Sequence, residues 1–157
     1  MRERKAGIIM NGVTGRMGLN QHLIRSILAI RAQGGLSLGD GTVLIPDPIL
    51  VGRNEEKLKA IAAAHGLSRW STDLARCLDN KEDTIYFDSG STGIREQNVL
   101  QAIAAGKHVY CEKPLSTTMH SAIKLAKAAD NAGVKHGVVQ DKLFLPGIRK
   151  LRRLIDS

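Results

Sequence analysis

The chain has 157 residues, of which 43% are hydrophobic and only 3% aromatic, so one domain with a core of Ala, Val, Ile and Leu is expected. The formal charge of +8 favours an anionic partner, such as a nucleic acid, a membrane surface or a phosphate-bearing cofactor. Because the start is charged and no run approaches about 18 apolar residues, we expect neither a signal peptide nor a membrane span.

Short apolar runs alternate with segments of helical periodicity. The expected strands are residues 6–10, 49–52, about 69–70, 84–88, 109–111 and 134–139. The expected helices are residues 16–32, one capped by Asn54 and ending at Gly66, a short one opened by Ser71 or Thr72, 94–105, one from Ser116 or Thr117 to Gly133, and one beginning at Pro146. Residues 36–48 are rich in Gly, Asp and Pro and are expected to form a loop. The alternation predicts the α/β class, as a Rossmann-type doubly wound parallel sheet with helices on both faces.

A glycine-rich turn, NGVTGRMG, joins the first expected strand to the first helix. The dinucleotide fingerprint GxGxxG uses its glycines for a tight turn and a close approach to pyrophosphate. Gly15 and Gly18 keep its last two positions, whereas the first glycine is shifted one residue earlier, to Gly12. Backbone N–H groups of residues 14–17 would face a diphosphate at the helix N-terminus. The predicted cofactor-binding residues here are Gly12, Thr14, Gly15, Arg16 and Met17; the alternative is an ordinary strand-to-helix loop.

The second strand ends without the acidic residue that usually holds the adenosine ribose. Arg53 stands there instead, and a guanidinium can grip a 2′-phosphate bidentately. We therefore predict NADP as cofactor in preference to NAD, with Arg53 and Asn54 as binding residues. The alternative is a surface arginine at the start of a helix.

The run GKHVYCEKPLS at residues 106–116 places a lysine at the end of a strand. In open α/β sheets this carboxyl edge is where ligands bind. The pattern indicates that Lys113 faces a ligand at this edge, and the alternative is a solvated lysine in a surface turn.

The segment AIAAGKHVYCEKPLS, together with the glycine turn, resembles the N-terminal domain of the Gfo/Idh/MocA oxidoreductase family. The resemblance implies an NAD(P)-dependent enzyme that transfers hydride between a nicotinamide cofactor and a sugar, polyol or related hydroxy or keto compound. It places Lys113 beside the nicotinamide and substrate as the expected catalytic residue, with a Lys113–Pro114 bond that is commonly cis. It also places Glu112 on the nicotinamide ribose side, so that both Glu112 and Lys113 are expected to bind the cofactor.

The chain departs from the family pattern after the fourth strand. The family often has Thr-Pro and a histidine there, whereas this chain has Ser-Gly-Ser-Thr at residues 89–92 and Arg95 at the histidine position. Backbone and hydroxyl groups of Gly90 and Ser91 are therefore expected to make the cofactor contact.

The family's second domain, an α+β sheet domain, is expected to be absent from this chain. We expect a dinucleotide-binding domain over residues 1–140 and the start of a truncated substrate domain over residues 141–157. The fragment alone would be inactive, and the full-length protein would be a cytoplasmic homo-oligomer. Cys77 and Cys111 lie in separate elements and are expected to be reduced core thiols.

Three alternatives compete with the oxidoreductase hypothesis. One is a stand-alone NADP-binding or redox-sensing module without catalysis. Another is a dihydrodipicolinate reductase-like enzyme, which the phrase GVTGRMG resembles but the Glu-Lys-Pro run does not support. A nucleic-acid binder is suggested by charge alone, without aromatic platforms. The five histidines show no metal-binding spacing, so we expect no metal. We also expect neither a nucleic-acid nor a membrane partner.

Overall fold

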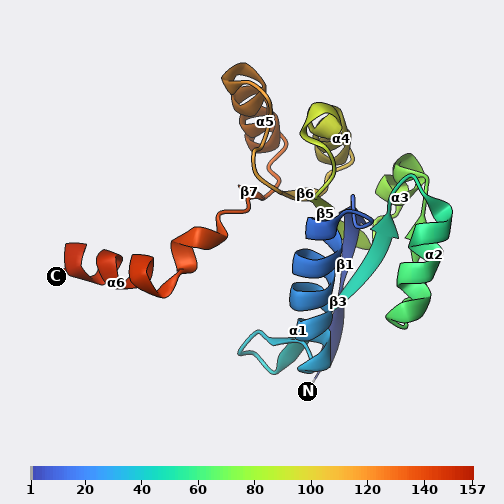
Figure 1. Ribbon diagram of the computed structural model, residues 1–157, viewed down its shortest axis with the longest axis horizontal. Coiled ribbons are helices and arrows are strands. Elements are labelled where there is room, and N and C mark those ends of the chain that lie inside the picture. Colours follow the sequence, from blue (N-terminus) through green and yellow to red (C-terminus); the bar gives the residue numbers. More distant parts are fainter. Residues whose placement is uncertain (1) are drawn as a thin grey trace.

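The computed structural model of the protein describes residues 2–157, which form a mostly parallel sheet flanked by helices (Figure 1). The strands lie in the order β2-β3-β1-β5-β6-β7, and β4 pairs with β3. The strands are β1 (Arg2–Asn11), β2 (Leu36–Ser37), β3 (Thr42–Val51), β4 (Trp70–Ser71), β5 (Asp83–Asp88), β6 (His108–Cys111) and β7 (His136–Val138). The helices are η1 (Met17–Leu28), α1 (Ala29–Ala32), α2 (Glu55–Ala64), α3 (Leu74–Asp79), α4 (Thr92–Ala104), α5 (Met119–Asn131), η2 (Asp141–Phe144) and α6 (Pro146–Ile155). The predicted α/β Rossmann class is confirmed.

The central strand β1 supplies both faces of the core because successive strand side chains point to opposite sides of the sheet. Ile9 lies in an apolar cluster with residues of α3, α4 and α5. Ile8 and Met10 lie in a second cluster with residues of η1 and α2. Helices therefore cover both faces, and the strand ends are left free at the edges of the sheet.

The prediction of a loop over residues 36–48 is wrong, because most of this segment belongs to strands β2 and β3. Residues of β3 pair in parallel with β1 along its whole length, and β2 pairs antiparallel with β3. Pro46 and Pro48 suggested a loop, but neither β2 nor β4 pairs with β3 at these positions. A strand tolerates proline where no neighbour needs its missing N–H. Arg31 donates to the Pro46 carbonyl at 2.5 Å, so a side chain satisfies the backbone there.

The first helix is wider than expected over most of its length. Residues 17–28 form a π-helix, the helix type whose N–H groups bond five residues back, and α-helix follows over residues 29–32. The Ser26 hydroxyl donates to the Gln21 carbonyl, five residues earlier, at 2.8 Å. The helix brings Met17 and His22 to one cleft at the sheet edge.

The predicted cap at Asn54 is confirmed, since its side chain accepts from the Lys57 N–H. Two other expected helix starts are wrong by one or two residues. Asp73 caps α3 and Thr118 caps α5, because only these side chains reach an amide three residues on. Helix α6 begins at Pro146 as predicted and extends away from the sheet in Figure 1.

Candidate cofactor site and active site

The ends of β1, β3 and β5 border a cleft of about 240 Å³, which we call the first cleft. In open α/β sheets, ligands bind outside the carboxyl ends of the strands. Six residues predicted to bind the cofactor line this cleft together: Gly12, Thr14, Gly15, Arg53, Gly90 and Ser91.

The glycine turn is built around Gly12, whose φ of +80° suits glycine. A Cβ on Gly12 would lie 2.4 Å from the Gly90 N atom, so no side chain fits. Val13 is fully buried in the core, which explains why a valine stands where the usual motif has glycine. The Gly15 N–H donates to the Gly12 carbonyl at 3.0 Å. That amide is therefore used inside the turn instead of facing a diphosphate as predicted.

Gly15 leaves the wall of the first cleft bare. A Cβ there would have only the Gly12 carbonyl oxygen within contact distance, at 3.4 Å, so a side chain would extend into open space. Bare backbone at the N-terminus of a helix such as η1 suits phosphate oxygens. The turn therefore fits the pyrophosphate of a dinucleotide.

The end of β3 presents Arg53 to the first cleft, and Arg53 is exposed. Asn54 does not line this cleft, because its Oδ1 accepts from the Lys57 N–H at 2.9 Å and caps α2. The structure thus brings Arg53 to the cleft and gives Asn54 a local structural role.

A second cleft, of about 450 Å³, lies between η1, the end of β6 and the segment that begins η2. Glu112 and Lys113 line it, together with Met17, Asp141 and Lys142. The Lys113–Pro114 bond is cis, as the family resemblance implied. Arg16, also predicted to bind the cofactor, precedes η1 and lines neither cleft.

His22 is a residue that the sequence analysis missed. Its Nε2 atom lies 2.6 Å from the Glu112 carboxylate, which also accepts from the Lys113 N–H at 2.9 Å. The His22 ring packs against Phe87 with a centroid distance of 4.5 Å. The available signal was its place one turn after the glycine turn, on a helix that begins at the carboxyl edge of the sheet. The Glu112 carboxylate, expected on the ribose side, is engaged by His22.

A polar cluster, the Asp88 cluster, joins β1, β5 and α4 and contains Asn11, Tyr86, Asp88 and Arg95. Asp88 is fully buried, and one carboxylate oxygen accepts from the Tyr86 hydroxyl at 2.6 Å and the Asn11 amide at 3.1 Å. The other oxygen accepts from the Arg95 Nε atom at 3.0 Å. Burial, followed by the Asp88 charge, raises the pKa of Tyr86 far above its usual range, so its hydroxyl stays a donor. Arg95, aligned with a cofactor-contacting histidine, lies inside the protein instead.

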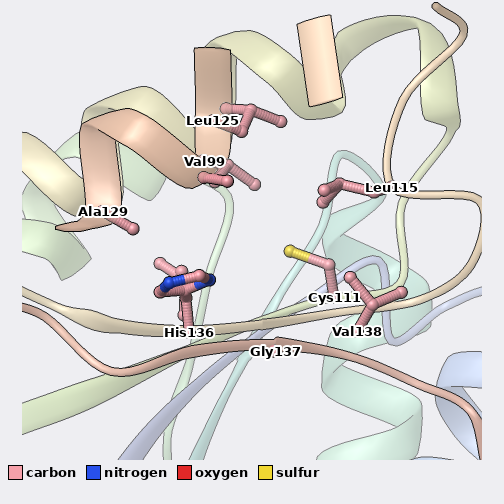
Figure 2. Close-up of a pocket in the computed structure, with 10 residues that line it drawn as sticks. Val99, Cys111, Leu115, Leu125, Ala129, His136, Gly137 and Val138 are labelled. Carbon is pink, nitrogen blue, oxygen red and sulfur yellow. The ribbon is translucent and has the colours of Figure 1, made fainter. Parts of the chain in front are cut away.

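A small apolar cavity lies between helices α4 and α5 and strands β6 and β7 (Figure 2). Its volume of about 30 Å³ is near that of one water molecule, so it is a packing gap and not a ligand site. Cys111 borders it as a buried free thiol, and burial raises the pKa of Cys111 to about 12. Burial also raises the pKa of Cys77, so both cysteines are protonated core thiols near neutral pH.

Among residues 2–157, no helix is both long enough and apolar enough to cross a bilayer. In the same part of the chain, no three His, Cys, Asp or Glu side chains are grouped so as to hold a metal ion.

Comparison with known proteins gives concordant matches. Residues 48–140 match the profile of the oxidoreductase family with an NAD-binding Rossmann fold. The D-xylose dehydrogenase of Paenarthrobacter nicotinovorans is 50% identical over 150 residues, which are 96% of this chain and 39% of that protein. The structure of a levoglucosan dehydrogenase with NADH and levoglucosan has a TM-score of 0.82 at 19% identity, covering 98% of this chain and 40% of the other. An oxidoreductase domain protein from Kribbella flavida gives a TM-score of 0.80 at 28% identity, over 97% of this chain and 38% of the other.

Proposed function

Because the chain belongs to the oxidoreductase family with an NAD-binding Rossmann fold, we propose that it is the cofactor-binding part of a sugar or polyol oxidoreductase. The chain spans 39% of the length of the D-xylose dehydrogenase that it matches, so the activity is proposed for the complete gene product. The observation that carries the proposal is the pair of clefts at one sheet edge, one formed around the glycine turn and the other containing Lys113. Residues 1–140 would be the dinucleotide-binding domain, and residues 141–157 would begin the substrate domain.

The first cleft would hold the adenosine and pyrophosphate of the cofactor. Gly12, Gly15 and Thr14 would face the pyrophosphate, and Gly90 and Ser91, which follow β5, would also contact the cofactor. When bound, the nicotinamide supplies or accepts the hydride. Arg53 is exposed at the cleft, at the strand end where an acidic residue usually holds the adenosine ribose. It would favour NADP over NAD by contacting the 2′-phosphate.

The second cleft would receive the substrate beside Lys113. The Lys113 ammonium would hydrogen-bond the reacting hydroxyl or carbonyl oxygen and help to move its proton. Glu112 stays buried beside His22, and its carboxylate accepts from the Lys113 N–H at 2.9 Å. This contact would hold the lysine backbone in place while its side chain faces the cleft.

The test uses both the complete gene product and this chain. The complete protein is mixed with D-xylose and either NADP⁺ or NAD⁺, and cofactor reduction is followed at the nicotinamide absorbance. Calorimetry measures NADP(H) binding to this chain by itself. We expect binding by the chain, turnover only by the complete protein, and NADP preferred over NAD. A folded chain that binds neither cofactor would contradict the proposal, and binding without turnover of any sugar or polyol by the complete protein would favour a binding module.

A further inference from the structure

We propose that Arg95 is a positioning residue that fixes the Lys113–Pro114 turn against the loop after β5, so that the two clefts keep one relative geometry. The inference rests on the proposed role of Lys113. It extends that proposal to a residue that touches neither cleft.

The guanidinium of Arg95 donates to three separate parts of the chain. Its Nε atom donates to Asp88 at the end of β5, at 3.0 Å. One terminal nitrogen donates to the Gly90 carbonyl at 2.8 Å, and the other donates to the Pro114 carbonyl. Arg95 therefore joins a strand end, a wall of the first cleft and the turn that carries Lys113.

Because Arg95 and Asp88 are buried, the bonds between them are costly to break. Arg95 is only 2% exposed and Asp88 is 0% exposed, so neither charge is solvated by bulk water. Breaking such a pair leaves an uncompensated buried charge. Asp88 is itself fixed, because Tyr86, Asn11 and the Gly90 N–H also donate to its carboxylate. The arginine thus projects from α4 onto an anchor that cannot easily move.

The positions of the bonded carbonyls define what Arg95 does. Gly90 lines the first cleft, and Pro114 directly follows Lys113, which lines the second. A planar guanidinium bonds both carbonyls in one rigid fork, whereas a lysine ammonium is a single point on a flexible stem. Arg95→Lys should keep the charge beside Asp88 but lose at least one of the two loop contacts.

The chain offers a matched control at the other end of the same strand. Arg69 bonds Asp83, which is fully buried at the start of β5, at 2.5 Å. Arg69 lines neither cleft. Arg69→Lys is therefore the same substitution at a buried carboxylate, with no connection to Lys113.

The first experiment is amide hydrogen exchange, read by mass spectrometry, on the complete gene product and on both variants without cofactor. Arg95→Lys should speed exchange roughly tenfold in residues 89–91 and 112–116 while leaving β1 and β3 unchanged, because local opening is reported segment by segment. Arg69→Lys should leave both loops as in the wild type. Uniform acceleration in Arg95→Lys, or no acceleration in the two loops, would overturn the proposal.

The second experiment is a double-mutant cycle that combines Arg95→Lys with Lys113→Met, using kcat for D-xylose and NADP⁺. If Arg95 acts through Lys113, Arg95→Lys should lower kcat roughly tenfold alone but less than twofold in the Lys113→Met background, since residues acting as a unit are non-additive. Equal losses in both backgrounds would show that Arg95 does not act through Lys113. If Lys113→Met leaves turnover unchanged, the proposed role of Lys113 fails, and the exchange result still decides whether Arg95 fixes the turn.

Discussion

The two ends of strand β5 carry the same pair of residue types but serve different purposes. Asp83 begins the strand and Asp88 ends it, and both are fully buried. Asp83 pairs with Arg69, whereas Asp88 pairs with Arg95. Only the pair at the carboxyl end also bonds the loops that border the two clefts.

The two carboxylates also differ in how completely their oxygens are hydrogen-bonded. Both oxygens of Asp88 accept hydrogen bonds, from Tyr86, Asn11, Gly90 and Arg95. Within residues 2–157, one oxygen of Asp83 has no donor. A fully satisfied buried network holds one arrangement more rigidly than a partly satisfied one. The comparison indicates that geometry is held most firmly at the end of the sheet where the site lies.

The largest expected effect is on stability, at the Asp83 end. Arg69→Met removes the ion-pair partner of the buried Asp83 carboxylate, which keeps the Asn80 amide as a donor. We expect the free energy of unfolding to fall by about 3 kcal/mol. Urea unfolding measures this loss, and calorimetry on the same protein measures NADP(H) affinity.

The cofactor affinity of folded Arg69→Met protein should match the wild type. A tenfold loss of affinity would break the comparison, because the opposite end of the strand would then also support the site.

The next largest effect is on kcat, at Lys113 near the carboxyl end of the sheet. Lys113→Met in the complete gene product should lower kcat by about a hundredfold, in line with general acid–base contributions. NADP affinity and the melting temperature should stay near wild-type values, because Lys113 lines the second cleft and not the first. Lys113→Arg should also be slow, since a planar fork does not replace a compact ammonium that can lose its proton. Near-normal turnover by Lys113→Met would reduce the Glu-Lys-Pro run to a structural turn.

A smaller effect is expected at the end of β3, where Arg53 is exposed to solvent. Arg53→Ala should weaken NADP by about tenfold to a hundredfold, the effect of losing one charge-assisted contact. NAD, which lacks the 2′-phosphate, should bind nearly as before. Calorimetry with both cofactors makes the comparison, and equal losses would show that Arg53 does not recognise the phosphate.

The sequence predicted the parts of the site that depend on neighbours in the chain. The glycine turn, the Asn54 cap and the lysine after β6 each follow from a local pattern, and each lies at the predicted strand or helix end. Only the end of β3, from residue 49, was predicted as a strand; residues 42–48 were expected to be a loop, because prolines indicate loops unless the sheet neighbours are known.

The long-range contacts could not be predicted from local pattern at all. His22 meets Glu112 across 90 residues of sequence, and Arg95 reaches Pro114 across 19. The local sequence around a helical histidine or arginine does not indicate which distant residue it will contact. The family resemblance aligned Arg95 with a histidine of the family, and only the packing of α4 against β5 shows that its side chain is buried.

The smallest expected effect separates the two neighbouring residues after β3. Asn54 caps α2 through its Oδ1 atom, so Asn54→Ala should lower the free energy of unfolding by about 1 kcal/mol. NADP affinity should change less than twofold, because Asn54 does not line the first cleft.

Asn54→Asp is the matched variant, since aspartate accepts the same Lys57 N–H and keeps the cap. Its new negative charge lies next to Arg53 and should weaken NADP several-fold while sparing NAD, because like charges near a phosphate repel it. Urea unfolding and calorimetry on both variants give the four values needed. If Asn54→Ala weakened NADP as strongly as Arg53→Ala while leaving stability unchanged, Asn54 would be a cofactor ligand, and the division between a capping residue and a phosphate-binding residue at this strand end would be wrong.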